Sequence, residues 1–162
     1  MKKQIIKTKF DKTFLIWFAG FFDGEGAFRI KRHGTSKNGR PSLHIGMSIS
    51  NTDLNALKYI RKNIGGRIKE RRRMNPRHKD LYSWSSTSTD SIQCITKAMF
   101  PYLIVKRERA KLILTFEKRE HLIGQGTSKA FMIKRRKNDL IFKKQLKLQE
   151  RMTRLNLRGK QL

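Results

Sequence analysis

The spacing of apolar and polar positions divides the first part of the chain into a helix and two strands. Residues 12–22 (KTFLIWFAGFF) are apolar on nearly every side, and such a helix must be buried in a core or between two subunits. Residues 27–33 and 42–51 alternate with a period of two, which predicts strands. The turn-rich residues 34–41 between them predict a hairpin.

The following segments repeat this order. Residues 53–66 have apolar positions at helical spacing and end in two glycines, which predicts a helix. Residues 67–73 and 81–86 predict a second hairpin, with Tyr82 and Trp84 on the face toward the core. Further helical patterns occupy residues 89–99, 106–122 and 129–157, the last with a weak apolar stripe of Phe131, Leu140, Leu146, Met152 and Leu155.

The order α-ββ-α-ββ-α-α predicts an α+β fold in which two hairpins form one antiparallel sheet with helices on one face. A chain of 162 residues can bury one sizeable core. We therefore expect one domain over residues 1–162, with its core in residues 10–125 and a basic helical segment at 126–162. Cys94, the only cysteine, lies between apolar neighbours and is expected to be a buried packing residue.

The charge of the chain points to a polyanion as its partner. Lys and Arg number 39 against 12 Asp and Glu, which gives a net charge of +27. An anionic membrane is the competing partner, but the chain has no apolar run of about 18 residues that could span a bilayer. We therefore expect a nucleic acid and no membrane association.

The outward positions of both predicted hairpins are basic or polar, and a twisted pair of strands fits the major groove of DNA. An ordinary solvated sheet face is the alternative interpretation. The residues predicted to contact DNA are Arg29, Lys31, His33, Ser42, His44, Gly46, Ser48, Arg67, Lys69, Arg71, Ser83 and Ser85.

The end of the first predicted helix, FAGFFDGEG at residues 18–26, concentrates the candidate chemistry. Gly20 and Gly24 are four residues apart and share one helix face, and such strips let two helices approach closely. Asp23 and Glu25 sit where the helix dipole disfavours negative charge. A divalent cation would relieve this conflict, although DGEG is also good turn chemistry.

These residues resemble a known family. FAGFFDGEG is similar to the LAGLIDADG motif of homing endonucleases, and PYLIVKRERA at 101–110 and RLNLRG at 154–159 also resemble family segments. The resemblance covers nearly the whole chain and is best over residues 12–122. It implies an αββαββα fold whose saddle-shaped sheet grips DNA. A chain with one motif resembles the members that form homodimers by packing their motif helices together.

The resemblance implies a site-specific double-strand DNA endonuclease of the intron-homing type. Such enzymes cut across the minor groove of a long pseudo-palindromic site and leave short 3′ overhangs. The implied cofactor is Mg²⁺, with Mn²⁺ or Ca²⁺ as possible substitutes, and no small-molecule cofactor is expected. The expected dimer contact is formed by Trp17, Ala19, Gly20 and Gly24.

The resemblance also assigns roles to single residues. Glu25 takes the place of the catalytic acid and metal ligand, and the carbonyl of Gly24 that of a second ligand. Lys106 aligns with a lysine that lies near the scissile phosphate. Asn51 takes the place of a polar residue that positions water, although Asn also suits the turn before a helix. Asp23 is expected to be structural and to tie the end of the motif helix to its neighbours.

The chain departs from the family pattern in two places. Its motif acid is Glu rather than Asp, and no basic residue follows Asn51 where some relatives have one. Two alternatives remain open: an intron maturase that binds RNA through its basic helical surface, notably KRRK at 134–137, and a DNA-binding regulator that does not cleave. The abundance of Lys and Ile is typical of an AT-rich genome such as an organelle's, but the compartment is not predicted.

Overall fold

The computed structural model describes residues 10–35, 41–71, 79–119 and 127–157. Its elements follow the predicted order of one helix and two strands, repeated and then followed by further helices. They are α1 (Lys12–Glu25), β1 (Gly26–Thr35), β2 (Pro41–Asn51), α2 (Leu54–Ile64), β3 (Arg67–Arg71), β4 (Leu81–Ser86), α3 (Thr89–Met99), the 3₁₀ turn η1 (Phe100–Tyr102), α4 (Arg107–Leu114) and α5 (Lys129–Leu157).

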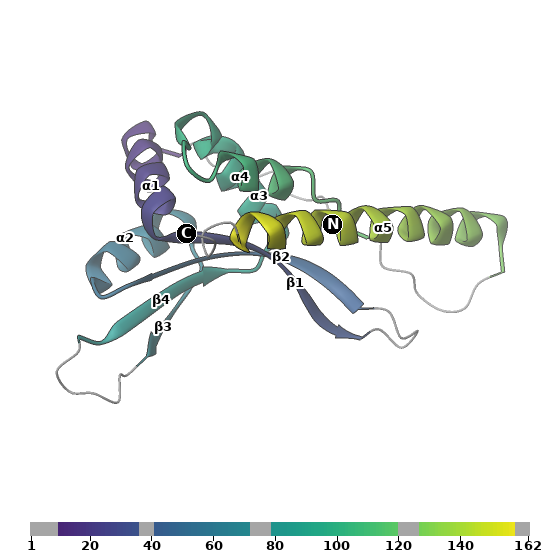
Figure 1. Cartoon of the computed structure of the whole chain (residues 1–162), viewed down its shortest axis with the longest axis horizontal. Coiled ribbons are helices and arrows are strands. Elements are labelled where there is room, and N and C mark those ends of the chain that lie inside the picture. Colours follow the sequence, from purple (N-terminus) through teal and green to yellow (C-terminus); the bar gives the residue numbers. More distant parts are fainter. Residues whose placement is uncertain (1–9, 36–40, 72–78, 120–126, 158–162) are drawn as a thin grey trace.

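The four strands form one antiparallel sheet in the order β1-β2-β4-β3. The central pair, β2 and β4, joins the two hairpins and places Ile49 opposite Trp84. The helices cover one face, while the strands bend away from them at both ends and leave the free face concave (Figure 1). The predicted α+β arrangement is therefore confirmed.

The core lies between the helices and the covered face of the sheet. Alternate strand residues such as Phe28, Ile45 and Trp84 are buried there, because side chains of period two share a face. The motif helix α1 contributes Phe14, Phe18 and Phe22, which lie one turn apart; Phe14 stacks on Phe18, and Phe22 packs on Phe28. These rings fix α1 against the sheet.

The glycine pair after α2 serves the packing of Trp84. Gly65 and Gly66 have φ values of 71° and 94°, in the left-handed region that favours glycine. A Cβ atom at Gly66 would overlap the Trp84 ring, whose Nε1 donates to the Gly65 carbonyl at 2.8 Å. The pair thus ends the helix and satisfies the one polar group of a buried tryptophan.

Three details of the predicted helices are corrected. Cys94 is exposed, because α3 buries Ile92 and Ile95 and turns Cys94 outward. The helix predicted at 106–122 ends at Leu114, where the Thr115 hydroxyl donates back to the carbonyls of the last turn; residue 122 lies outside the described part of the chain. The third correction concerns α5.

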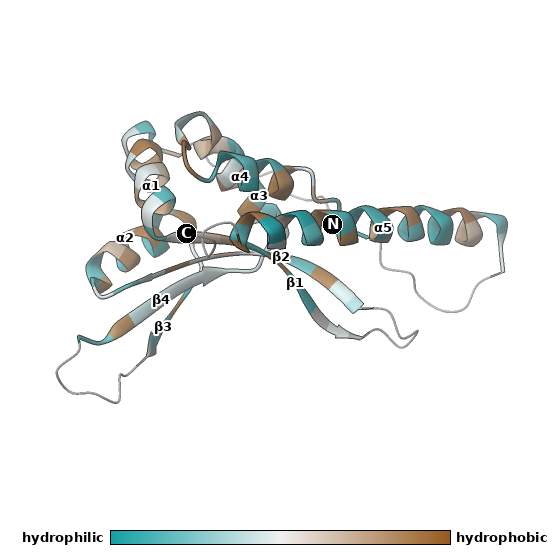
Figure 2. Ribbon diagram, in the orientation of Figure 1, coloured by the Kyte–Doolittle hydropathy of each residue, from teal (hydrophilic) through white to brown (hydrophobic). Residues whose placement is uncertain are grey.

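The long helix α5 packs through part of the predicted stripe, since Met152 is buried and Leu146 and Leu155 pack against the core. The prediction is wrong at Leu140, which is 62% exposed; the other buried positions are Asn138, Ile141 and Gln145. Hydrophilic and hydrophobic residues alternate along its whole length (Figure 2). Within the described ranges, none of the helices combines the length and the apolar character needed to cross a membrane.

Candidate nucleic-acid interface and active site

The free, concave face of the sheet carries the residues that were predicted to contact DNA. The strand register aligns them on one face across all four strands, since side chains two residues apart point the same way. The cross-strand pairs are Arg29–Gly46, Lys31–His44, His33–Ser42, Ser48–Ser85, Arg67–Ser85 and Lys69–Ser83, and Arg71 pairs with Leu81. The side chains of His33 and Arg71 lie outside the described part of the structure; none of the other predicted contact residues is buried.

The basic residues of β1 are divided between the two faces of the sheet, and Arg32 lies on the helix side. It pairs with the buried Leu43 and so belongs to the helix side, where its Nε donates to Gln149 Oε1 of α5 at 3.3 Å. Arg29 and Lys31 point to the free face and are exposed. The basic character of the free face therefore comes from alternate positions, as the sequence pattern predicted.

The motif helix α1 has one side that the described chain covers only in part, where Trp17 packs on Phe21 and Tyr59. Ile16 and Trp17 are 49% and 37% exposed, and Gly20 and Gly24 continue the same side. A Cβ atom at either glycine would meet no other atom within 4 Å. We call Ile16, Trp17, Gly20 and Gly24 the α1 strip. Ala19 is a correction to the predicted contact surface, since it is fully buried in the core beneath the strip.

Two apolar residues beside the end of α1 were missed by the sequence analysis. Ile104 and Val105, between η1 and α4, are 84% and 67% exposed. Their main-chain N–H groups donate to the Asp23 carboxylate, which places them against the last turn of α1. The sequence did contain a signal: Ile104 and Val105 are an apolar pair directly before the polar start of a helix, and they do not continue its apolar stripe.

Asp23 connects the end of α1 to the start of α4. Its Oδ2 accepts from the main-chain N–H groups of Ile104 and Val105 at 2.6 and 3.1 Å, and its Oδ1 from that of Lys106 at 2.9 Å. The Lys106 ammonium donates to the main-chain carbonyl of Asp23. The expectation that Asp23 ties the motif helix to its neighbours is confirmed.

Lys106 is partly buried in this junction, and its surroundings act on its charge in both directions. Burial lowers the pKa of the ammonium below its usual range, and Arg109 lowers the pKa further. The negative charges of Asp23 and Glu25 raise the pKa but do not offset burial. The Asp23 carbonyl lies two residues before Glu25, so its bond to the ammonium places Lys106 near another of the residues predicted to be catalytic.

Glu25 is the last residue of α1, and its side chain is exposed. The helix ends here, so the carbonyls of its last turn have no further helical N–H groups to bind. A carboxylate and a carbonyl at the negative end of a helix form a donor set of hard oxygens, which suits Mg²⁺. Among the described residues, no group of three or more His, Cys, Asp or Glu side chains could hold a metal ion. A cation bound by Glu25 and a main-chain carbonyl would therefore need further ligands.

Comparisons with known proteins place this geometry in a family. A family model described as LAGLIDADG endonuclease matches residues 18–121. The chain belongs to the LAGLIDADG endonuclease family. No curated protein sequence matches it significantly.

Solved structures of homing endonucleases share the fold. I-CvuI bound to a DNA target in the presence of Mg is 19% identical, with 89% of this chain and 82% of that chain covered and a TM-score of 0.64. The archaeal intron-encoded I-Vdi141I, complexed with DNA, is 17% identical, with 90% and 86% covered and a TM-score of 0.65. I-TnaI is 21% identical, with 87% and 94% covered and a TM-score of 0.56.

The closing glycine of the LAGLIDADG motif has a packing reason in this structure. Gly26 is buried where α1 turns into β1, and a Cβ atom there would overlap the Phe22 ring. The main-chain N–H of Gly26 donates to the Phe22 carbonyl and ends the helix. The glycine thus lets β1 start directly beside Glu25.

Asn51 lies at the same end of the sheet as the motif. The register places Ile49 opposite Gly26, and Asn51 follows two residues later. Its Oδ1 accepts from the main-chain N–H of Asp53 at 2.8 Å, a turn that leads into α2. This hydrogen bond supports the turn interpretation, and the water-positioning role stays a prediction.

Proposed function

We propose that this protein is a site-specific double-strand DNA endonuclease of the homing type that acts as a homodimer. The observation that carries the proposal is the position of Glu25. Its exposed carboxylate ends the motif helix beside Lys106, where β1 begins and leads into the basic concave face. DNA gripped by that face would run past the carboxylate.

The homodimer is supported by the α1 strip. Trp17 and Ile16 are exposed beside two glycines, which is unusual for the solvent side of a helix. Small residues such as glycine let two helix backbones pack closely. Ile104 and Val105 extend the apolar surface toward Glu25. The structural match to the DNA-bound meganuclease I-SmaMI, at 20% identity and a TM-score of 0.55, covers 85% of this chain but only 42% of that chain. Two copies of this chain would therefore approach the length of I-SmaMI.

The two subunits would divide the chemistry of cleavage. Glu25 and the Gly24 carbonyl of each chain would hold a divalent cation, for which Mg²⁺ is the expected ion. When bound, such a cation stabilises the attacking water and the leaving 3′-oxygen of a phosphodiester. Lys106 would place its ammonium near the scissile phosphate and stabilise the negative charge that develops there. Packing of two α1 strips would bring the two Glu25 residues together, one for each strand.

The direct test of this function is selection from a randomised duplex library. The protein is incubated with the library with and without Mg²⁺, and the bound and the cut molecules are sequenced separately. We expect a pseudo-palindromic site, because a two-fold dimer presents the same face to both half-sites. Cleavage should require the metal and leave short 3′ overhangs. Selective binding without cleavage in Mg²⁺ or Mn²⁺ would instead identify a DNA-binding regulator.

DNA affinity should fall steeply with salt. If each subunit neutralises several phosphates, affinity drops about 10³–10⁵-fold between 50 and 200 mM salt. Two arginines of β1 provide a matched pair for this measurement. Arg29→Ala on the free face should lower affinity by about 10-fold or more, whereas Arg32→Ala, which loses a bond to Gln149, should leave affinity and salt slope nearly unchanged. Equal losses from both variants would contradict the assignment of the sheet face.

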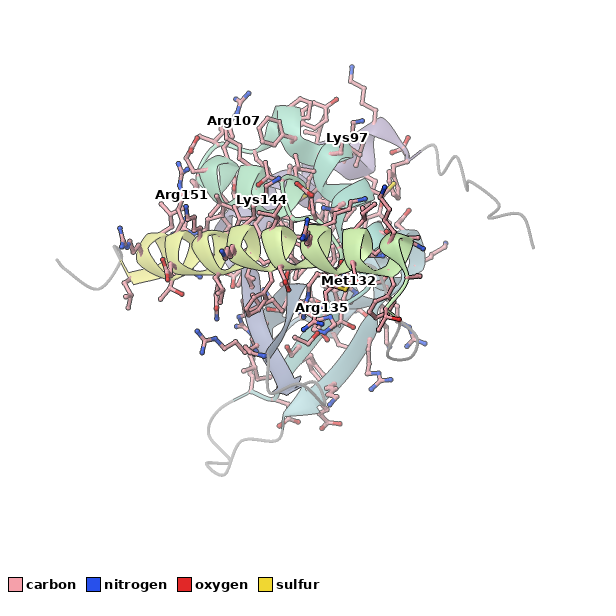
Figure 3. All side chains as sticks on the ribbon, turned by 90° about the vertical axis from the view of Figure 1, so that its right-hand side faces the viewer. Lys97, Arg107, Met132, Arg135, Lys144 and Arg151 are labelled. Carbon is pink, nitrogen blue, oxygen red and sulfur yellow. The ribbon has the colours of Figure 1, made fainter. Side chains whose placement is uncertain are left out.

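A second candidate function, RNA binding as an intron maturase, is favoured by α5. This helix lies across the side of the molecule shown in Figure 3, where Arg135, Lys144 and Arg151 are displayed on it. Residues 134–137 (KRRK) are all exposed. This surface belongs to the helix layer and is separate from the concave face of the sheet. Retention of intron RNA that a specific DNA duplex cannot displace would support this second function.

A further inference from the structure

The last turn of α1 and the segment that leads into α4 exchange hydrogen bonds. A helix leaves carbonyls without partners at its C-terminus and N–H groups without partners at its N-terminus. Here the Asp23 carboxylate, in the last turn of α1, accepts from the N–H groups of Ile104 and Val105, in the turn before α4, and from that of the N-cap residue Lys106. In return the ammonium of Lys106, the N-cap residue of α4, donates to a main-chain carbonyl in the last turn of α1.

Each half of this exchange is favoured by a helix dipole. Negative charge is stabilised at the N-terminus of a helix and positive charge at the C-terminus. The Asp23 carboxylate and the Lys106 ammonium each sit at the favourable end of the other residue's helix. The conflict noted in the sequence, an acid at the end of its own helix, is therefore resolved for Asp23 by α4.

The exchange determines where the Lys106 ammonium lies. Lysine has a long and flexible side chain, and one left in solvent would sample many positions. In this structure the main-chain carbonyl of Asp23, two residues before Glu25, holds the ammonium. Asp23 therefore does two things: its carboxylate anchors residues 104–106, and its carbonyl determines where the Lys106 ammonium lies relative to Glu25.

We propose that Asp23 is a positioning residue for DNA cleavage, which fixes the Lys106 ammonium beside Glu25 by holding the start of α4 against the end of α1. This inference rests on the proposed nuclease function and extends it. Asp23 itself need not touch DNA or metal; it acts through Lys106. Its carboxylate is required because two acceptor oxygens serve three N–H groups.

Asparagine at this position would keep only part of the junction. Its single acceptor oxygen can serve the N–H groups of Ile104 and Val105, but its NH₂ group would then face the Lys106 N–H, donor against donor. The start of α4 would shift, and the ammonium would lose its fixed position. The loss should therefore appear in the cleavage step even where the protein stays folded and bound to DNA.

A double-mutant cycle on cleavage tests the proposal. Asp23→Asn, Lys106→Met and the double variant are compared under single-turnover conditions, with protein in excess over the selected DNA. Lys106→Met should slow cleavage by about 10²-fold, as expected for loss of one charge-stabilising group. Asp23→Asn should slow it by about 10-fold or more, and the double variant should be no slower than Lys106→Met, because each change disables the same ammonium.

Asp11→Ala is the control for loss of a helix cap. Asp11 caps the other end of α1 by accepting from the Phe14 N–H at 2.8 Å, so an alanine there removes the cap without touching Lys106. It should lower the Tm and leave the single-turnover rate unchanged. If Asp23→Asn likewise lowers only the Tm, or if its effect on the rate adds fully to that of Lys106→Met, Asp23 is only a cap and the proposal is overturned.

Thermal unfolding separates failure of this inference from failure of the nuclease function. In protein without DNA, Lys106→Met should change the Tm less in the Asp23→Asn background than in the wild type, because the junction is already loosened. Additive Tm changes would contradict the proposed coupling between Asp23 and Lys106, whether or not any DNA is cut. A protein that shows the coupling in Tm but cleaves no DNA would instead refute the proposed function and, with it, a role of Asp23 in cleavage.

Discussion

Replacement of Glu25 by glutamine is expected to abolish DNA cleavage and to leave DNA binding intact. The side chain is exposed at the end of α1, so the nearly isosteric amide should not disturb the core. What disappears is one negative charge per subunit at the place where a hard divalent cation would prefer a carboxylate. Metal assistance contributes several kcal/mol to such reactions, which corresponds to a loss of about 10³-fold or more in rate.

The measurement pairs single-turnover cleavage in Mg²⁺ with DNA binding in EDTA. Binding by Glu25→Gln should equal or exceed that of the wild type in EDTA, because a carboxylate near the scissile phosphates repels DNA when no cation lies between them. Glu150→Gln, an exposed acid on α5, is the matched control and should cleave normally. If Glu25→Gln cuts the target at near wild-type rate in Mg²⁺, the metal site lies elsewhere.

The second large effect is expected from Gly20→Leu, which should dissociate the dimer. In one chain this position is exposed and a Cβ atom there meets nothing within 4 Å, so a leucine is tolerated by the protomer. In the proposed dimer two leucines would face each other between closely packed helices. Overpacking of this kind costs about 1–3 kcal/mol per site, which weakens association by about 10-fold or more for each leucine. Double-strand cleavage should fall with it.

Sedimentation and cleavage assays at matched protein concentrations test this expectation. Ala130→Leu, a small-to-large change at an exposed position of α5, controls for the added apolar surface and should alter neither the dimer nor the rate. An unchanged dimer with full double-strand cleavage by Gly20→Leu would show that the α1 strip is not the contact between subunits. The free face of the motif helix would then need another explanation.

The sequence alone determined the elements and the faces of the sheet. A period of two or of 3.6 residues is a property of the local backbone, so it can be recognised without knowing what packs on it. That is why the alternation of Arg29 and Lys31 with Phe28 and Ile30 predicted correctly which side chains face the core. The motif was equally local, because the acids and glycines of residues 18–26 lie on one turn-and-helix segment.

Only the tertiary structure decided how the motif is completed. The partners of the Asp23 carboxylate lie 81 to 83 residues further along the chain, and no local pattern connects them. Ala19, Cys94 and Leu140 were misplaced for a related reason: helical spacing shows which residues share a side, but the neighbouring elements decide which side is covered. The exposure of Ile104 and Val105 has the same cause, since their backbone is held by a carboxylate while nothing in the described chain covers their side chains. Such long-range choices depend on which surfaces meet when the whole chain folds, and a single sequence does not state them.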